Sequence, residues 1–201
     1  MTTADDAEHA QKKARIKAAK DKLYASKTIE KGLLIVHTGT GKGKSTAAWG
    51  LAMRCLGHGL KLGVVQFVKG RRETGERQLL ERFPELVTIK VMGEGFTWET
   101  QDKARDIEAA EAAWVETEKM LQDPELHMVI LDELNIVLRY DYLPLDRVLA
   151  AFRDKRPDLH LVVTGRNAKP ELIEAADLVT EMTLVKHPFR QGVKGQLGVE
   201  W

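Results

Sequence analysis

A glycine- and lysine-rich segment, HTGTGKGKSTAAWG, holds the residues best suited to chemistry. Its glycines allow backbone angles that other residues disfavour, so successive amide N–H groups can point at phosphate oxygens. Lys44 adds a positive charge, and the helix that follows adds the positive end of its dipole. The segment is therefore interpreted as a P-loop whose phosphate-binding residues are Gly39, Thr40, Gly41, Lys42, Gly43, Lys44, Ser45 and Thr46.

The loop departs from the usual spacing in one respect. The first glycine of the standard motif would fall where this chain has Thr38, and the loop also carries an additional Lys42. The hydroxyl of Ser45 is suited to bind a phosphate-bound Mg²⁺, and Thr46 offers a hydroxyl to a phosphate oxygen. The alternative is a glycine-rich turn with unrelated lysines. The agreement of strand, loop and helix argues against that alternative.

An acidic pair, Asp132 and Glu133, ends the apolar run HMVILD. P-loop proteins place a carboxylate here beside the magnesium ion, and hydrolases use the second carboxylate to orient water. Capping of the next helix is the alternative role for Glu133. We predict that Ser45, Asp132 and Glu133 hold Mg²⁺, and that the acidic pair follows a strand neighbouring the P-loop strand, at the same edge of the sheet.

Two further features are less specific. Phe96 and Trp98 are aromatic residues one position apart in a glycine-flanked segment. They would share a face on a strand or form a wedge in a loop, and core packing is the alternative that the pattern alone favours. Arg54 follows Lys44 by ten residues on the predicted helix. It is a candidate contact to the nucleotide, and a surface arginine is the equal alternative.

Six short apolar runs alternate with helical patterns after residue 31. The runs are continuous, as in a sheet covered on both faces, and most intervening segments are long enough for crossover helices. Clear helices are predicted at 44–58 and 100–121. We predict an α/β fold: a three-layer α/β/α domain with a mostly parallel central sheet, of the P-loop NTPase, RecA-like type. The predicted strands are 33–37, 63–68, 86–92, 127–132, 159–164 and 178–185.

Composition narrows the class of protein. The chain has 201 residues, 43% of them hydrophobic, and lacks the apolar run of about 18 residues that crosses a bilayer. Its net charge of +1 offers no basic groove for nucleic acid, so neither nucleic acid nor membrane is an expected partner. The single Cys55 excludes an internal disulfide and a paired-thiolate zinc site. The first thirty residues lack a secretory signal, which predicts a cytoplasmic protein.

The composition changes near Lys31. Residues 1–30 are predicted as a helical or partly disordered segment, and residues 31–201 as the P-loop domain. In the first segment Ile16, Ala19 and Leu23 recur at helical spacing, which makes only a thin apolar stripe. Such a segment is either a mostly disordered tail or one that orders over a ligand or a second subunit.

Several ordered motifs from about Lys31 to Trp201 resemble the bacterial P-loop corrinoid adenosyltransferases. The motifs are TGTGKGKSTAAWGLAMRCLGHG, VVQFVKG, GFTWETQD, LDELNIVLRYDYLP, VVTGRN and VKHPFRQGVKGQLG. The resemblance implies an ATP-dependent transferase in which the cobalt(I) of cobalamin or a precursor attacks the 5′ carbon of ATP and expels triphosphate. The reaction would serve biosynthesis or salvage of adenosylcobalamin. Reduced cobalt is already a strong nucleophile, so no Ser, Cys or His nucleophile is needed.

The resemblance also implies roles for particular residues. Lys44 would be catalytic by stabilising the leaving triphosphate, aided by Lys42 and by Mg²⁺ or Mn²⁺. Phe96 and Trp98 would be catalytic by pressing on the lower face of the corrin, displacing its axial ligand and easing reduction of cobalt(II). The implied assembly is a homodimer that receives electrons from a flavoprotein.

Other functions remain as alternatives from the residues alone. A P-loop ATPase acting on nucleic acid would share the core but would need a basic groove. A small-molecule kinase would keep the standard P-loop spacing and carry an arginine-rich lid. A corrinoid carrier without catalysis would have no need of a complete ATP site.

Overall fold

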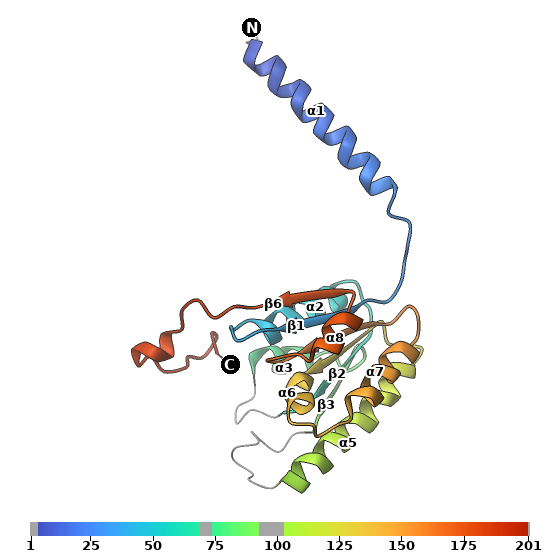
Figure 1. Ribbon diagram of the computed structural model, residues 1–201, viewed down its shortest axis with the longest axis vertical. Coiled ribbons are helices and arrows are strands. Elements are labelled where there is room, and N and C mark those ends of the chain that lie inside the picture. Colours follow the sequence, from blue (N-terminus) through green and yellow to red (C-terminus); the bar gives the residue numbers. More distant parts are fainter. Residues whose placement is uncertain (1–3, 69–73, 93–102, 201) are drawn as a thin grey trace. The chain divides into compact units, whose positions relative to one another are not determined.

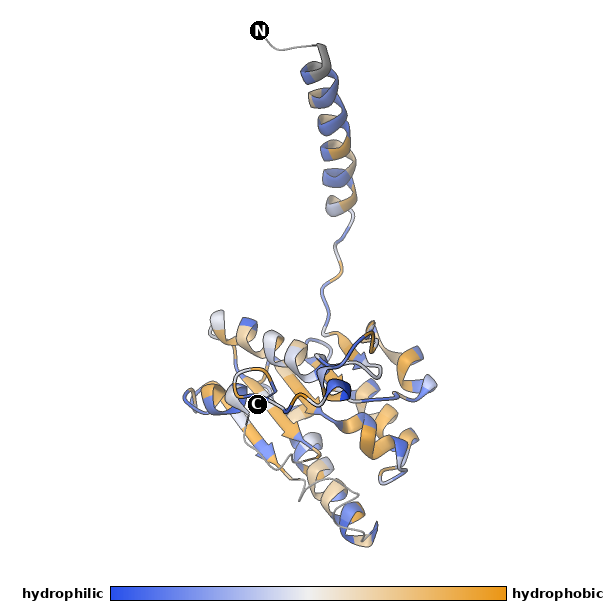
Figure 2. Cartoon of the chain, turned by 90° about the vertical axis from the view of Figure 1, so that its left-hand side faces the viewer, coloured by the Kyte–Doolittle hydropathy of each residue, from blue (hydrophilic) through white to orange (hydrophobic). Residues whose placement is uncertain are grey.

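The computed structural model describes residues 4–68, 74–92 and 103–200, and the chain divides into two units, Met1–Glu30 and Lys31–Trp201. The first unit contains α1 (Ala4–Ala25). Its thin apolar stripe stays exposed, with Ile16 at 44% and Leu23 at 54%. In Figure 2 this helix is mostly hydrophilic, with hydrophobic residues at intervals. The helix therefore has little apolar surface with which to stabilise itself by packing.

The second unit is built on a six-stranded, all-parallel sheet in the order β3-β2-β4-β5-β1-β6 (Figure 1). In this order β5 separates the P-loop strand β1 from the acidic-pair strand β4. The strands are β1 (Leu34–Thr38), β2 (Leu62–Gln66), β3 (Val87–Val91), β4 (Met128–Asp132), β5 (His160–Thr164) and β6 (Leu178–Glu181).

Helices cover both faces of this sheet and make three layers. On one face Ile35, Ile130 and Val162 pack with Ala48 and Trp49 of α2. This face is covered by α2 (Lys44–Gly57) and α3 (Gly75–Leu80). The other face is covered by α5 (Lys103–Gln122), α6 (Leu134–Arg139), α7 (Leu145–Asp154) and α8 (Pro170–Ala175). Apolar residues at successive strand positions enter opposite cores, which explains the continuous apolar runs and their orange colour in Figure 2.

The predicted fold class is confirmed, and the predicted strands and the helix predicted at 44–58 agree with the structure to within about two residues, except at two points. Strand β6 ends at Glu181 rather than at residue 185. The next residues instead lie against the P-loop, where the amide of Gly41 donates to the carbonyl oxygen of Met182 at 2.6 Å. The second difference concerns strand order: β1 and β4 are not neighbours, so that prediction is wrong. Beyond β6, the chain continues through a short 3-10 helix, η1 (Pro188–Gln191).

A search of the described ranges finds no helix with both the length and the apolar character required to span a membrane.

Candidate nucleotide and metal site

A cavity of about 370 Å³ lies at the carboxyl ends of β1, β2, β4 and β5, within the size range of small-molecule sites. The P-loop and the acidic pair, far apart in sequence, both line it. Parallel strands bring their carboxyl ends to one edge, and ligand sites of such sheets collect there. The lining residues are Lys42, Gly43, Lys44, Ser45, Thr46, Trp49, Gln66, Val68, Thr74, Glu76, Arg77, Asp132, Glu133, Arg166, Val199 and Glu200.

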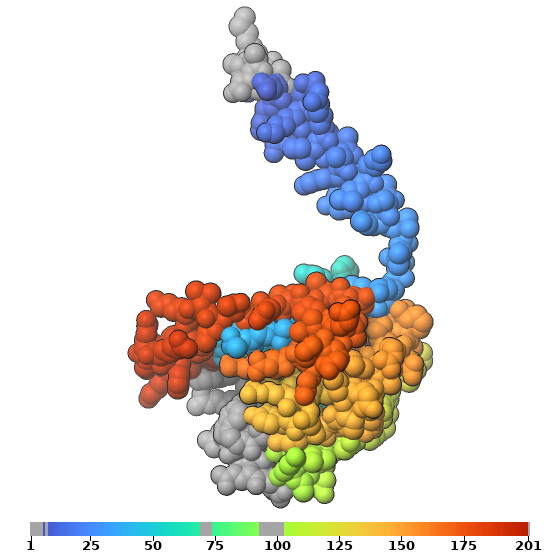
Figure 3. All heavy atoms as spheres, viewed as in Figure 1, coloured from blue at the N-terminus to red at the C-terminus, as the bar shows by residue number. Residues whose placement is uncertain are grey.

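The P-loop has a backbone that requires glycine. Gly39 and Gly43 have φ values of +97° and +103°, in the region that L side chains rarely adopt. A Cβ on Gly39 would lie 2.5 Å from the carbonyl oxygen of Met182, and one on Gly41 would lie 2.7 Å from the same atom. Gly39 and Gly41 therefore let the loop pack closely against the backbone of Met182, and neither glycine lines the cavity. Figure 3 shows the C-terminal segment, in red, bordering the blue surface near residue 40.

The two lysines of the loop lie in different environments. Lys44 is buried, and its Nζ donates to the carbonyl oxygen of Gly41 at 2.5 Å. Burial lowers the pKa of Lys44, and the nearby carboxylate of Glu133 partly opposes that effect. Lys42 is exposed and forms an ion pair with Glu200. One lysine is thus held inside the loop, while the other bridges the loop to the C-terminal segment.

The two carboxylates of the acidic pair also lie in different environments. Asp132 accepts hydrogen bonds on both carboxylate oxygens, from Thr164 Oγ1 at 2.7 Å and from Gln66 Nε2 at 3.2 Å. Glu133 Oε2 is buried with no hydrogen-bond partner among the described residues. Burial, reinforced by the charge of Asp132, raises the pKa of Glu133 to about 7. Glu133 also has a φ of 62°, a left-handed backbone that is uncommon outside glycine and is associated with functional sites.

These residues fit a divalent ion. Ser45, Asp132 and Glu133 line one cavity and offer only oxygen atoms, the ligands that Mg²⁺ prefers. A carboxylate oxygen buried without a partner is costly unless something charged or polar meets it. A cation beside Glu133 Oε2 would remove that cost.

Some lining residues were not identified from the sequence. Gln66, Thr74, Arg77 and Arg166 line the cavity, and Thr164 lies just behind it. Arg166 follows Gly165, whose φ is +128° and whose added Cβ would lie 3.1 Å from Glu133 Oε2. Gln66 and Arg166 fall within motifs that carried the family resemblance, so those motifs were the available signal.

The structure does not bring every predicted residue to this cavity. Arg54 is exposed in the last turn of α2. The ten residues from Lys44 span about 15 Å along the helix axis, so a contact of Arg54 with the nucleotide or the corrin stays a prediction. Thr40 is exposed on the loop and is not among the lining residues. Phe96 and Trp98 lie outside the described residues.

Comparison with known proteins matches residues 30–201 to the family described as ATP:corrinoid adenosyltransferase BtuR/CobO/CobP. A corrinoid adenosyltransferase of Sinorhizobium sp is 54% identical over 199 residues, covering 98% of this chain and 93% of that protein. One from Pseudomonas aeruginosa is 55% identical over 196 residues, covering 98% and 97%. One from Escherichia coli K12 is 44% identical over 196 residues, covering 98% and 99%.

Proposed function

The chain belongs to the ATP:corrinoid adenosyltransferase family, and we propose on that premise that it transfers the 5′-adenosyl group of ATP to the cobalt(I) of a corrinoid and releases triphosphate. The observation that carries the proposal is the family match over residues 30–201. Relatives named for this activity are 44% to 55% identical over nearly the whole chain, which supports it further. The reaction would serve biosynthesis or salvage of adenosylcobalamin.

In this reaction the electron pair of cobalt(I) forms the cobalt–carbon bond while the bond from C5′ to the triphosphate oxygen breaks. The leaving triphosphate keeps the electron pair of the broken bond. The protein must therefore orient the 5′ carbon and stabilise negative charge on the leaving group. Lys44 would do this after its Nζ exchanges the Gly41 carbonyl oxygen for a phosphate oxygen, and its position at the N-terminus of α2 supports that role. This reaction requires no activated water molecule, so Glu133 does not have to act as a general base.

Mg²⁺, with Mn²⁺ as a substitute, would be held by Ser45, Asp132 and Glu133. When bound there, the ion would supply positive charge to the triphosphate oxygens. The oxygen-only donor set and the unpartnered Glu133 Oε2 support this assignment. Lys42 would contribute after leaving Glu200.

The corrin side of the site rests on Phe96 and Trp98, by resemblance to the family. We propose that these rings press on the lower face of the corrin and displace its axial ligand, which makes cobalt(II) easier to reduce. A flavoprotein would supply the electron. We also propose that the enzyme acts in the cytoplasm as a homodimer, with residues 1–30 as a segment separate from the catalytic domain, residues 31–201.

Phe96→Ala tests the role of the rings. ATP binding and melting temperature should be nearly unchanged. Turnover should fall sharply when the assay starts from cobalt(II) with a weak reductant, and the defect should shrink when cobalt(I) is supplied. Equal losses in both assays, with destabilisation of about 3 to 5 kcal/mol, would mean that the ring is a packing residue.

The function itself is tested by mixing the protein with ATP and chemically reduced cobalamin. The adenosylated product should appear in the absorption spectrum, with triphosphate as the second product. Release of orthophosphate without the cobalt–carbon product would instead indicate an ATPase. Transfer of the terminal phosphate to a small molecule would indicate a kinase.

A further inference from the structure

A row of polar side chains crosses the sheet immediately beneath the cavity. Gln66, Asp132, Thr164 and His37 are aligned in register across β2, β4, β5 and β1. Each lies two residues after a core residue that packs on the α2 face, so all four lie on that face. The row therefore runs from the acidic-pair strand to the P-loop strand, and side-chain hydrogen bonds link Gln66, Asp132 and Thr164 within it.

Thr164 makes two hydrogen bonds in this row, and their directions are fixed by chemistry. The amide of Glu133 can only donate, so it donates to Thr164 Oγ1, at 3.0 Å. The single hydroxyl proton of Thr164 is then available for the carboxylate of Asp132, with 2.7 Å between Oγ1 and Oδ1. One hydroxyl thus links the side chain of Asp132 to the backbone of Glu133.

This link occurs where the backbone of the acidic pair is unusual. Glu133 has a φ of 62°. The backbone N–H of the same residue donates to Thr164 Oγ1, so this hydrogen bond lies directly beside the left-handed backbone. Gln66 holds the other oxygen of Asp132 at 3.2 Å, a longer contact. Both bonds end on the same carboxylate, and the shorter of the two is the one from Thr164. Among the described contacts of Asp132, the hydroxyl of Thr164 is therefore the main restraint on carboxylate orientation.

Thr164 cannot itself touch a ligand. Its exposed fraction is 0%, and it is not among the residues that line the cavity. We propose that Thr164 is a positioning residue for the acidic pair: its hydroxyl sets the directions in which Asp132 and Glu133 present oxygens to the divalent ion and the triphosphate. The inference rests on the proposed function and names a residue through which that same site is assembled.

The test compares three variants. Thr164→Val keeps the shape of the side chain and removes the hydroxyl, whereas Thr164→Ser keeps the hydroxyl. The matched control is Thr117→Val on α5, because Thr117 is also 0% exposed and its hydroxyl donates to the carbonyl oxygen of Ala113 at 3.0 Å. Thr117 lies outside the row, so its replacement reports the cost of deleting a buried hydroxyl elsewhere in the domain.

The first readout is binding, which does not require turnover. Mn²⁺ is titrated into the full-length protein with ATP, and bound Mn²⁺ is followed by electron paramagnetic resonance. Loss of a hydrogen bond to a charged group predicts roughly ten- to hundred-fold weaker Mn²⁺ binding for Thr164→Val. The Mn²⁺ affinity of Thr164→Ser should be within about threefold of that of the unmodified protein. The Mn²⁺ affinity of Thr117→Val should equal that of the unmodified protein. In turnover assays Thr164→Val should lower kcat while leaving the KM for the corrinoid unchanged.

Two results would overturn the inference. One is Mn²⁺ binding by Thr164→Val equal to that of Thr117→Val. The other is a Thr164→Ser variant as impaired as Thr164→Val, with both melting at the same lowered temperature, because that pattern indicates packing. If the unmodified protein binds Mn²⁺ with ATP yet forms no adenosylated corrinoid, the proposed function fails while the binding comparison still decides the role of Thr164.

Discussion

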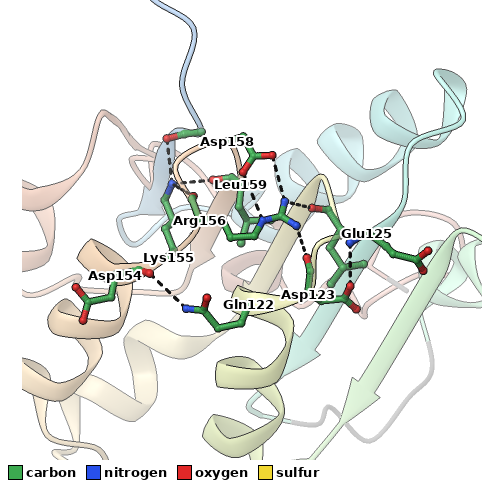
Figure 4. Close-up of polar contacts among 10 residues, drawn as sticks. Gln122, Asp123, Glu125, Asp154, Lys155, Arg156, Asp158 and Leu159 are labelled. Carbon is green, nitrogen blue, oxygen red and sulfur yellow. Dashed lines mark hydrogen bonds and ion pairs between the residues drawn. The ribbon is translucent and has the colours of Figure 1, made fainter.

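The amino and carboxyl edges of the central sheet differ in how their polar groups are hydrogen-bonded. At the amino edge, Lys155 Nζ donates to the carbonyl oxygens of Gly32 at 3.1 Å and Leu159 at 2.8 Å (Figure 4). Arg156 donates from Nη2 to the carbonyl oxygen of Leu126 at 2.7 Å and from Nη1 to that of Asp123. These two cationic side chains donate hydrogen bonds to carbonyl oxygens just before β1, β4 and β5 begin. The amino edge thus uses its charges to complete the hydrogen bonding of the fold.

At the amino edge Arg156 Nε is buried without a hydrogen bond but lies 3.4 Å from Asp158 in an ion pair, whereas at the carboxyl edge more polar atoms are buried without partners. Glu133 Oε2, Asn135 Oδ1 and both ring nitrogens of His37 have no hydrogen-bond partner among the described residues. Burial lowers the pKa of His37, because desolvation disfavours the charged ring. Unsatisfied buried groups cost stability, and they persist where a ligand is to meet them. The difference teaches that one edge is built for stability and the other for binding.

The largest effect is expected at the carboxyl edge. Lys44→Ala should reduce adenosyl transfer by roughly 10²- to 10³-fold, because a charge-assisted contact to the leaving triphosphate is lost. Stability should change little, since the variant removes a buried amine whose hydrogen bond, among the described residues, is to the carbonyl oxygen of Gly41 in its own loop. Turnover at low ATP and denaturant unfolding are measured together, with Ser45→Ala as the milder comparison. Near-normal turnover of Lys44→Ala at low ATP would contradict the role given to the loop.

The amino edge should respond in the opposite way. Arg156→Ala leaves the carbonyl oxygens of Asp123 and Leu126 without their donor, which should lower the free energy of unfolding by about 2 to 4 kcal/mol. ATP affinity should be unchanged. The control is Arg153→Ala, a neighbouring exposed arginine on α7. Urea unfolding and calorimetric ATP titration measure the two quantities. If Arg156→Ala lost ATP affinity without being destabilised, the proposed difference between the two edges would be wrong.

A pH-dependent effect is expected from Glu133, whose pKa is raised to about 7 by burial and by Asp132. A carboxyl group with a raised pKa destabilises the ligand-free fold above that pKa, and the penalty disappears below the ordinary value near 4.5. Glu133→Gln should therefore stabilise the ligand-free protein by up to about 2 kcal/mol at pH 8 and not at pH 4.5. Thermal unfolding across this range tests the sign.

The same titration predicts that Mg²⁺-dependent ATP binding by the unmodified protein weakens as the pH falls below 7. A gain for Glu133→Gln that is constant with pH would show that the carboxyl group is not titrating.

The smallest effect concerns the ion pair between Lys42 and Glu200 at the mouth of the cavity. Glu200→Gln should tighten ATP binding by no more than about fivefold, because Lys42 no longer exchanges a carboxylate for a phosphate. The gain should shrink at high salt. Glu125→Gln, which breaks the exposed pair with Lys61 far along the chain, is the control and should leave ATP affinity unchanged.

Local pattern predicted much of this molecule. Continuous apolar runs identified all six strands, and the glycine spacing identified the P-loop, because both depend on neighbouring residues. The sequence did not reveal that β5 lies between β1 and β4, since strand order depends on contacts between distant segments. That same strand supplies Thr164 and leads into Arg166, and neither was identified as a site residue. Arg54 lies outside the lining of the cavity because ten residues of helix separate it from Lys44.

The order of strands also bears on how the protein is synthesised. Strand β1 leaves the ribosome early, yet its two partners are β5 and β6, and Leu34 pairs with Leu161, 127 residues later. Strands β2 and β3 are consecutive and can pair as soon as both have emerged. The nascent chain must therefore hold the apolar β1 unpaired while most of the domain is translated. The phosphate loop is among the first parts of the domain to be made and among the last to be fixed, and until then its apolar strand is exposed to non-native contacts.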